Sequence, residues 1–414
     1  MTVVVAVVPF GAVVEGGGDA DHRERPGRWA RQIARRLVDR FSGETAVELK
    51  PVFLVAMPET TSDPGYLVFG STPDATLAAE YARSLGATHA LTGTYREGAT
   101  ARRLEASLVD AADGSVVSVF ERDIPEGELH LAEPALAAWL ATALGVTVAH
   151  DLGAPAAKNE AAYQTLLSGM DAEVDATLLR ASDAKASAAA LRRAAAAYTF
   201  AARADPTSQP IEERILVMAA AAIENEQQPL VLEALETLAE TRPSSWRLQY
   251  MLGEVRRTSG DLNGAIVAFE HADALQALRP ADSLTLAQLH IAAGSQATAA
   301  SRLRRIVRAG AEAPVTAAAR RLLLGLRHPE LEKDLESAGK IAVDADLSRA
   351  AEAEAAFERV LAAEPDLWEA HFGRGLLAWQ RGDADGAQAS FERAIALNPA
   401  AAELLSDLGK AVQN

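Results

Sequence analysis

Side chains able to do catalytic chemistry are few in this sequence, and they are not arranged in a known catalytic pattern. Cysteine is absent, which excludes disulfides, thiolate metal sites and a cysteine nucleophile. The motifs G-x-x-x-x-G-K-[ST], G-x-G-x-x-G and G-x-S-x-G, which serve phosphate, dinucleotide and acyl-transfer chemistry, are also absent. The eight histidines are scattered, without the spacing of metal ligands. We therefore predict a non-enzymatic protein that uses no cofactor and no metal.

Two runs of arginine could instead bind acidic groups. The first run is accompanied by few acids and comprises Arg302, Arg304, Arg305, Arg308, Arg320, Arg321 and Arg327. If these residues share a face, we expect a basic patch that binds an acidic segment or the acidic surface of a second copy. The alternative is that they are scattered over solvated helix faces. The second run, at residues 23–40, is partly offset by acids and lacks stacking aromatics, so we do not predict nucleic-acid binding.

The composition of the chain indicates a core-forming protein with an acidic surface. Its 414 residues are 49% hydrophobic and carry a net charge of −17, and at roughly 100–200 residues per domain they predict two or three domains. The acidic balance argues against affinity for nucleic acid or anionic membranes, and no apolar run has the length of a transmembrane helix. Residues 1–10 are apolar but lack the basic residues of a signal peptide, so we expect a cytoplasmic protein. The high Ala and Arg content indicates a bacterial origin.

The first 150 residues alternate between predicted strands and predicted helices. Helices are expected over 28–42, 74–85 and 131–144, and Asp74 after Pro73 predicts an N-cap for the second. Residues 111–114 (AADG) predict a hairpin turn. Strands or extended segments are expected over 2–10, 47–57, 66–69, 88–95, 104–110 and 116–124. This alternation predicts an α/β fold, a mixed sheet with flanking helices, over residues 1–150.

Several of these segments resemble the TolB amino-terminal-like and FlgO-like domains. Residues 5–10 (VAVVPF) resemble the opening strand of that family, and residues 66–74 (YLVFGSTPD) lead into a helix as they do there. Residues 82–95 (ARSLGATHALTGTY) and 104–114 (LEASLVDAADG) resemble two later segments. The resemblance covers about residues 2–148 and departs from the family at 11–25, which is rich in glycine and charge. It implies a non-enzymatic domain, often found beside helical repeats or signalling outputs, with no catalytic residues to carry over.

After a predicted linker at residues 151–158, the chain is expected to be helical and repetitive to residue 414. The clearest unit spans 368–401, and it resembles the tetratricopeptide (TPR) repeat. Counting Trp368 as position 1, the matching residues are Gly375 at 8, Gly382 and Asp383 at 15 and 16, Ala387 at 20, Phe391 at 24, Ala394 at 27 and Pro399 at 32. The same frame recurs from residue 159 onward. We predict an all-α TPR solenoid of about six helix pairs with a C-terminal capping helix.

The repeat count is interrupted near His328. Residues 316–326 predict a helix that ends at Arg327-His328-Pro329, and residues 329–343 then serve as the first helix of the next pair. The helix at 316–326 is left without a partner. We expect a register break or a bend here, and an alternative pairing remains open.

The resemblance to TPR repeats implies which side chains line a concave groove. Groove positions 2, 5, 9 and 12 of the units at 246 and 368 are Arg247, Tyr250, Glu254, Arg257, Glu369, Phe372, Leu376 and Trp379. Aromatic residues exposed in a groove would suit an extended or helical peptide. The alternative is that Phe372 and Trp379 pack on the neighbouring helix. The groove lacks the Lys and Asn of chaperone-binding TPRs, so a chaperone clamp is not expected.

The sequence supports two hypotheses about function. The first is a scaffold or adaptor whose TPR groove binds a protein or peptide partner, without nucleic acid or membrane and with scope for self-association. The second is a regulatory or signalling module that acts in trans on an output protein, with the N-terminal α/β domain sensing a ligand or partner. A third hypothesis is an enzyme with an unfamiliar site. An unexpected metal or nucleotide bound to the purified protein would support it.

Overall fold

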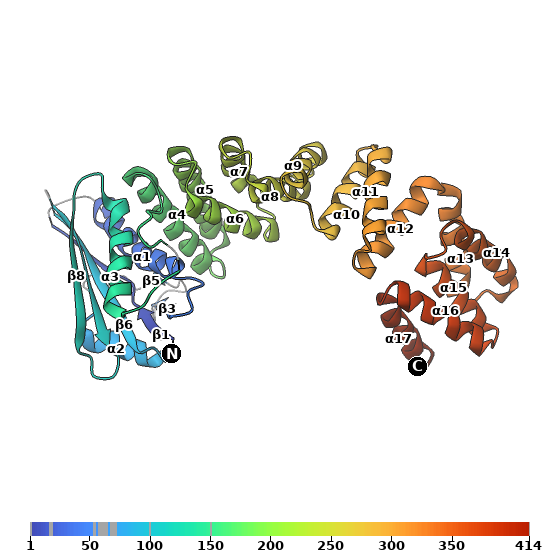
Figure 1. Ribbon diagram of the computed structural model, residues 1–414, viewed down its shortest axis with the longest axis horizontal. Helices are drawn as coiled ribbons and strands as arrows, with labels where there is room; N and C mark the ends of the chain where they lie inside the picture. Colours follow the sequence, from blue (N-terminus) through green and yellow to red (C-terminus); the bar gives the residue numbers. More distant parts are fainter. Residues whose placement is uncertain are drawn as a thin grey trace. The chain divides into compact units, whose positions relative to one another are not determined.

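The computed structural model describes residues 2–15, 20–52, 55–56, 65–66, 73–98, 101–149 and 151–413. Its first part is a mixed β-sheet flanked by helices (Figure 1). The sheet has the order β3-β1-β6-β7-β8, and β2 also pairs with β6. The strands β1, β2 and β3 run parallel to their neighbours, whereas β6, β7 and β8 are antiparallel. The bounds are β1 Val3–Val7, β2 Gly11–Val14, β3 Val47–Pro51, β6 His89–Glu97, β7 Arg102–Asp110 and β8 Val116–Ile124.

Most predicted strands appear in the sheet, with two differences. The expected strand at 2–10 is shorter, since β1 ends at Val7, and a second strand, β2, begins at Gly11 beyond the predicted segment. Pro9 lies in the gap and has no N–H with which to continue the ladder. The expected strand at 47–57 ends as β3 at Pro51, and a separate two-stranded sheet pairs β4 (Val55–Ala56) with β5 (Gly65–Tyr66). The expected apolar segment 66–69 lies outside the described residues beyond Tyr66.

Helices cover both faces of this sheet. On one face, α2 (Ala75–Ser84) packs its alanines against Ala6, Ala90 and Val109. As predicted, Asp74 caps this helix, accepting a hydrogen bond from the Leu77 N–H at 2.8 Å. On the other face lie α1 (Ala20–Arg40) and α3 (Ala132–Leu144), and α3 is preceded by the short 3-10 helix η1 (Leu129–Leu131).

From residue 160 onward the described chain is a series of paired helices, and the fold class expected from the sequence is confirmed (Figure 1). The structure forms two compact units, residues 1–259 and residues 260–414. In the first unit, the sheet is followed by α4 (Glu160–Leu179), α5 (Ala184–Ala204), α6 (Gln209–Glu224), α7 (Pro229–Thr241) and α8 (Trp246–Thr258).

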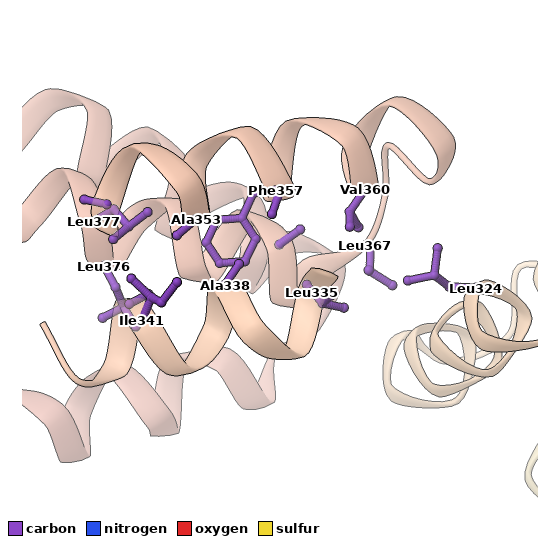
Figure 2. Packing of buried hydrophobic residues seen from close by; sticks show 14 residues of the cluster. Leu324, Leu335, Ala338, Ile341, Ala353, Phe357, Val360, Leu367, Leu376 and Leu377 are labelled. Carbon is purple, nitrogen blue, oxygen red and sulfur yellow. The ribbon is translucent and has the colours of Figure 1, made fainter. Parts of the chain in front are cut away.

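The second unit contains the clearest repeats and a large apolar cluster. Its helices are α9 (Leu262–Leu275), α10 (Pro280–Ala292), α11 (Gln296–Ala309), α12 (Ala313–Arg327), α13 (Pro329–Val343), the short 3-10 helix η2 (Leu347–Arg349), α14 (Ala350–Ala363), α15 (Trp368–Gln380), α16 (Ala384–Leu397) and α17 (Ala400–Gln413). In Figure 2, Phe357 lies in the middle of the cluster, with Leu376 and Leu377 toward one end and Leu367 and Leu324 toward the other.

Glycines allow the helices of this cluster to approach closely. A Cβ on Gly375 would lie 2.6 Å from Cε1 of Phe391, so α15 and α16 meet where position 8 of the repeat predicts a small residue. A Cβ on Gly373 would lie 2.2 Å from Cζ of Phe357. Heavy atoms in a packed interior are separated by about 3.5–4.0 Å, so only glycine fits at these two positions.

The helix α12 stands between two helix pairs. It packs against α11 on one side and is followed directly by α13, which pairs with α14. Ala319 and Leu323 belong to the apolar cluster of α10 and α11, whereas Leu324 belongs to the cluster of α13, α14 and α15. Its end at His328 is the point where the repeat count from the sequence is interrupted.

Candidate protein-interaction surfaces

The arginines of α1 are structural residues that attach the sheet to the first repeat helix. Arg31 donates hydrogen bonds from Nη2 to both carboxylate oxygens of Asp171 on α4 at 3.0 Å, and Gln32 donates to the same carboxylate at 3.0 Å. Asp171 is buried. Arg31, a member of the arginine run at residues 23–40, is therefore directed at an acid inside the protein.

A second buried carboxylate, Glu133 of α3, completes this connection. Its oxygens accept hydrogen bonds from Nε of Arg40 at 2.9 Å and from the hydroxyl of Tyr163 on α4 at 3.0 Å. Arg36 lies 3.8 Å away. Burial, together with the negative charge of Glu133, holds the pKa of Tyr163 well above its ordinary value. The phenol therefore stays protonated and donates its hydrogen bond to Glu133 at all physiological pH values.

The segment 151–158, predicted as a linker, has no helix or strand but is packed in place. Ala156 and Ala157 are buried. The carbonyl of Ala156 accepts a hydrogen bond from Oγ of Ser208 at 2.6 Å, and the Lys158 N–H donates to Asp205 at 2.8 Å. In the first unit, the α/β region is therefore joined to the helices by a network of internal contacts.

A cavity of about 200 Å³ lies among α4, α5, α6 and α7. No pattern in the sequence predicted a cavity at this place. At its rim, Arg180 donates from Nη2 to Oδ1 of Asn225 at 2.6 Å. A sequence pattern that could have indicated this cavity is the presence of small residues at the facing ends of these helices, because small side chains leave space between helices. Its lining residues are Ala176, Thr177, Arg180, Ala184, Ser187, Leu191, Met218, Ala221, Ala222, Asn225, Gln227 and Leu230.

The four predicted groove residues of α8 differ in their exposure. Arg247 is exposed, and Tyr250 is half-buried with its ring centroid 6.3 Å from that of Trp246. Glu254 and Arg257 form an ion pair with each other at 2.7 Å. Their charges therefore offset one another, and the exposed part of this surface is Trp246 with Arg247.

The four predicted groove residues of α15 divide between core and surface. Leu376 is buried in the apolar cluster, and Phe372 packs between Trp368 and Phe391 with ring centroids 6.1 and 5.4 Å away. Phe372 thus follows the alternative interpretation, in which it packs on the neighbouring helix. Trp379 does not, because it is 50% exposed. Burial raises the pKa of Glu369, and Arg321 opposes that effect only in part.

Trp379 lies near the C-terminal end of α15, which meets the C-terminal end of α13. Nε2 of Gln380 donates to the carbonyl of Ala342 at 2.5 Å, which brings the C-terminal ends of α13 and α15 together. Val343, the last residue of α13, is 67% exposed, and Leu347 is 53% exposed. We call Val343, Leu347 and Trp379 the Trp379 patch.

The predicted basic patch is not a continuous set of unpaired arginines. Acids from other helices neutralise most of its members, because repeats that are distant in sequence bring those acids close. Arg302 bonds Asp273 at 2.7 Å, Arg320 bonds Asp366 at 2.9 Å, and Arg321 lies 3.4 Å from both Glu332 and Glu336. Arg305 lies 3.7 Å from Asp273, and Arg327 lies 3.8 Å from Glu364. Arg304 and Arg308 are exposed on α11 and have no ion pair within the described residues.

Comparison with known proteins identifies the class of the helical part. Residues 343–402 and 374–412 match a family model described as tetratricopeptide repeat. The matched region contains α14, α15, α16 and the Trp379 patch. Tetratricopeptide repeats are thus present in the C-terminal part of a chain that begins with a mixed α/β region, and TPR repeats are in general protein–protein interaction modules.

Solved structures of other TPR proteins also resemble this chain. MamA is 17% identical, with a TM-score of 0.27 over 45% of this chain and 96% of MamA. YrrB, described as a TPR protein with an unusual peptide-binding site, is 17% identical, with a TM-score of 0.25 over 50% of this chain and 94% of YrrB. The P58(IPK) TPR domain is 15% identical, with a TM-score of 0.26 over 69% of this chain and 98% of that domain. No curated protein matches the chain.

Within the described ranges, no helix is both long enough and apolar enough to cross a bilayer. The same residues include no group of three or more His, Cys, Asp or Glu side chains placed to hold a metal ion.

Proposed function

We propose that this protein is a non-enzymatic interaction scaffold whose TPR helices bind a protein or peptide partner. The observation that carries this proposal is the Trp379 patch, in which a tryptophan at a predicted groove position is half exposed near the end of α15 while Val343 and Leu347 are exposed at and just after the end of α13. Tryptophan is enriched among the residues that contribute most to binding energy in protein interfaces. An exposed group of large apolar side chains beside a repeat groove therefore supports a docking role.

The charge around this patch supports a particular kind of partner. Asp344 and Asp385 are exposed near the ends of α13 and α15, and residues 329–414 carry a net charge of −9. Complementary charge favours encounter and orientation of a partner of opposite sign. We therefore propose that the preferred partner is a segment with an apolar anchor residue flanked by Lys or Arg.

A binding experiment tests this proposal. The full chain would be screened against a peptide library by fluorescence polarisation, with Trp379→Ala beside the control Val267→Ala, which removes a 64% exposed valine on α9. We expect apolar–basic peptides to bind and Trp379→Ala to weaken them at least tenfold, with the control unchanged. Equal binding by wild type and Trp379→Ala, or no preference for basic flanks, would contradict the proposal.

We also propose that the α/β region is a TolB amino-terminal-like or FlgO-like domain spanning residues 1–150. Three features support this identity. The sequence VAVVPF begins in β1, and α2 follows the capping Asp74. The two later segments that resemble the family lie in the end of α2 with β6, and in β7 with the turn that follows it. An experimental structure of the chain, superposed on solved members of that family, would test it. A different strand order in those members would contradict the assignment.

A further inference from the structure

The strand β8 has an open outer edge. It is the last strand in the order β3-β1-β6-β7-β8, and within the described residues no strand pairs with its outer side. Three of its residues are exposed valines: Val116 at 50%, Val117 at 49% and Val119 at 54%. An unpaired edge presents a row of free N–H and C=O groups, to which another strand can add.

The register shows that the valines share one face of the sheet. Val116 pairs with Val109 and Val119 with Ser107, and residues two apart on a strand point to the same side. The register shifts between Leu108 and Val109, which pair with Ser118 and Val116. Val117 therefore has no partner on β7 and forms a β-bulge with Val116. This is the face on which α2 packs, but α2 lies over β6 and β7.

The opposite face of β8 is covered. Ser118 and Phe120 point to that side, where Nε1 of Trp139 on α3 donates to Oγ of Ser118 at 3.2 Å. The ring of Phe120 lies 5.6 Å from that of Trp139. The strand is therefore held in place by α3, while its valines remain unpacked within the described structure.

Charge is confined to the second half of the strand. Residues 116–120 carry none, whereas Glu121, Arg122 and Asp123 follow in succession. Arg103 of β7 lies 2.7 Å from Asp123 and 3.6 Å from Glu121. Proteins usually protect exposed edges with charged residues or proline, and the first half of β8 has neither.

We propose that residues 116–120 of β8 pair antiparallel with the same segment of a second copy of this chain, about a two-fold axis at Ser118. This register places Val119 of each copy opposite Val117 of the other, with Val116 adjoining, so the exposed valines of the two copies contact one another along the new strand pair. Arg122 of each copy then lies opposite Gly114 of the other and next to its Asp113, so these two opposite charges approach each other. Asp123 lies opposite Asp113, but Arg103 already pairs with Asp123 at 2.7 Å. A two-fold interface of this kind is self-complementary and closed. It is independent of the proposed TPR function, because it uses only the sheet.

Sedimentation velocity of the full chain over a range of concentrations tests the pairing. We expect wild type to form a concentration-dependent dimer and Val119→Lys to be monomeric, since lysine on an edge opposes pairing. Val119 is half exposed, so the variant should keep the wild-type circular dichroism and melting temperature. The control Val267→Lys on α9 should dimerise like wild type. A monomeric wild type, or a Val119→Lys variant that dimerises equally, would overturn the proposal.

A cross-linking variant fixes the register. The chain contains no cysteine, so Ser118→Cys introduces a single thiol at the proposed axis, where Cα atoms of paired strands lie about 4.5–5.5 Å apart and within disulfide reach. We expect a covalent dimer on mild oxidation, and none with Ser301→Cys on exposed α11. A covalent dimer absent from Ser118→Cys, or equally abundant in the control, would exclude this register.

Discussion

The junction of α1, α3 and α4 in the first unit and the cluster of α13 to α16 in the second are held together in different ways. The junction is built from buried charges, with Asp171 and Glu133 surrounded by arginines from α1. The cluster is built from apolar side chains, with Phe357 and Phe391 fitted against glycines. The cluster follows from a repeated local pattern, whereas the junction depends on partners more than ninety residues apart. The difference shows that a repeat motif predicts its own packing but not what the repeat array is attached to.

The largest expected effect comes from cutting the chain at the sequence-predicted domain boundary. A fragment of residues 1–150 loses α4, which leaves Glu133 without Tyr163 and Arg31 without Asp171. Unpaired charges and newly exposed apolar surface should leave this fragment partly unfolded or aggregated. A fragment of residues 1–259 should fold with a cooperative melt. Circular dichroism and ANS fluorescence would compare the two, and a stable, monomeric 1–150 fragment would show that the junction is dispensable.

Removing one buried carboxylate should test the junction directly. Glu133→Ala leaves the buried Arg40 without its acid and Arg36 with Asp39 alone, and breaking a buried ion pair in this way costs about 3–5 kcal/mol of unfolding free energy. The control Glu48→Ala removes an exposed carboxylate on β3 and should change stability by less than about 0.5 kcal/mol. Urea unfolding would measure both. If Glu133→Ala changed the free energy of unfolding as little as the control does, the buried ion-pair network would contribute little to stability.

The corresponding test of the apolar cluster is a single added methyl group. In Gly373→Ala the new Cβ would clash with Phe357, and overpacking a core costs about 1–3 kcal/mol. In Gly339→Ala on α13 the Cβ meets no atom within 4 Å, so the better helix propensity of alanine should stabilise by up to about 1 kcal/mol. In urea unfolding, the free energy of unfolding should therefore fall for Gly373→Ala and rise for Gly339→Ala. If the two variants were equally stable, the side chains around Gly373 would have to rearrange to accommodate the added methyl group.

The smallest effects concern pH, where the two units should respond with opposite signs. For Glu160 on α4, burial raises the pKa, but Arg102 and the Leu129 N–H lower it by more, so the net pKa lies below its ordinary value. Its stabilisation is present above the unfolded pKa of about 4.3 and is lost as pH falls through the folded pKa. For Glu369 on α15, burial raises the pKa. Its contribution is therefore greatest below the unfolded pKa and is lost as pH rises through the folded pKa.

Urea unfolding of wild type, Glu160→Gln and Glu369→Gln between pH 3 and 7 would check this contrast. As pH rises, wild type should gain stability relative to Glu160→Gln and lose stability relative to Glu369→Gln. The same sign for both differences would contradict the environments described for these two carboxylates.

Much of the fold was predictable because local patterns specify it. The strand at 116–124, the Asp74 cap and the close contact between Gly375 and Phe391 all appear as expected. The candidate surfaces were less predictable. Phe372 and Trp379 are both predicted groove residues on α15, yet Phe372 packs on Phe391 while Trp379 is exposed. Most arginines of α11 and α12 appeared to lack acids only because their partners, such as Asp273 and Asp366, lie elsewhere in the sequence.

The sequence by itself determined the class of protein: a mixed sheet with helices, followed by TPR repeats without a recognisable catalytic motif. Periodicity, turn residues and small residues at fixed spacing act over a few to some thirty residues, so they can be read along the chain. Only the tertiary structure decided which acids pair with which arginines, that the sheet and helices α4 to α8 share one compact unit, and which apolar residues remain exposed on β8 and α15. These features depend on contacts between distant segments, because burial and charge pairing are properties of a residue's neighbours in space.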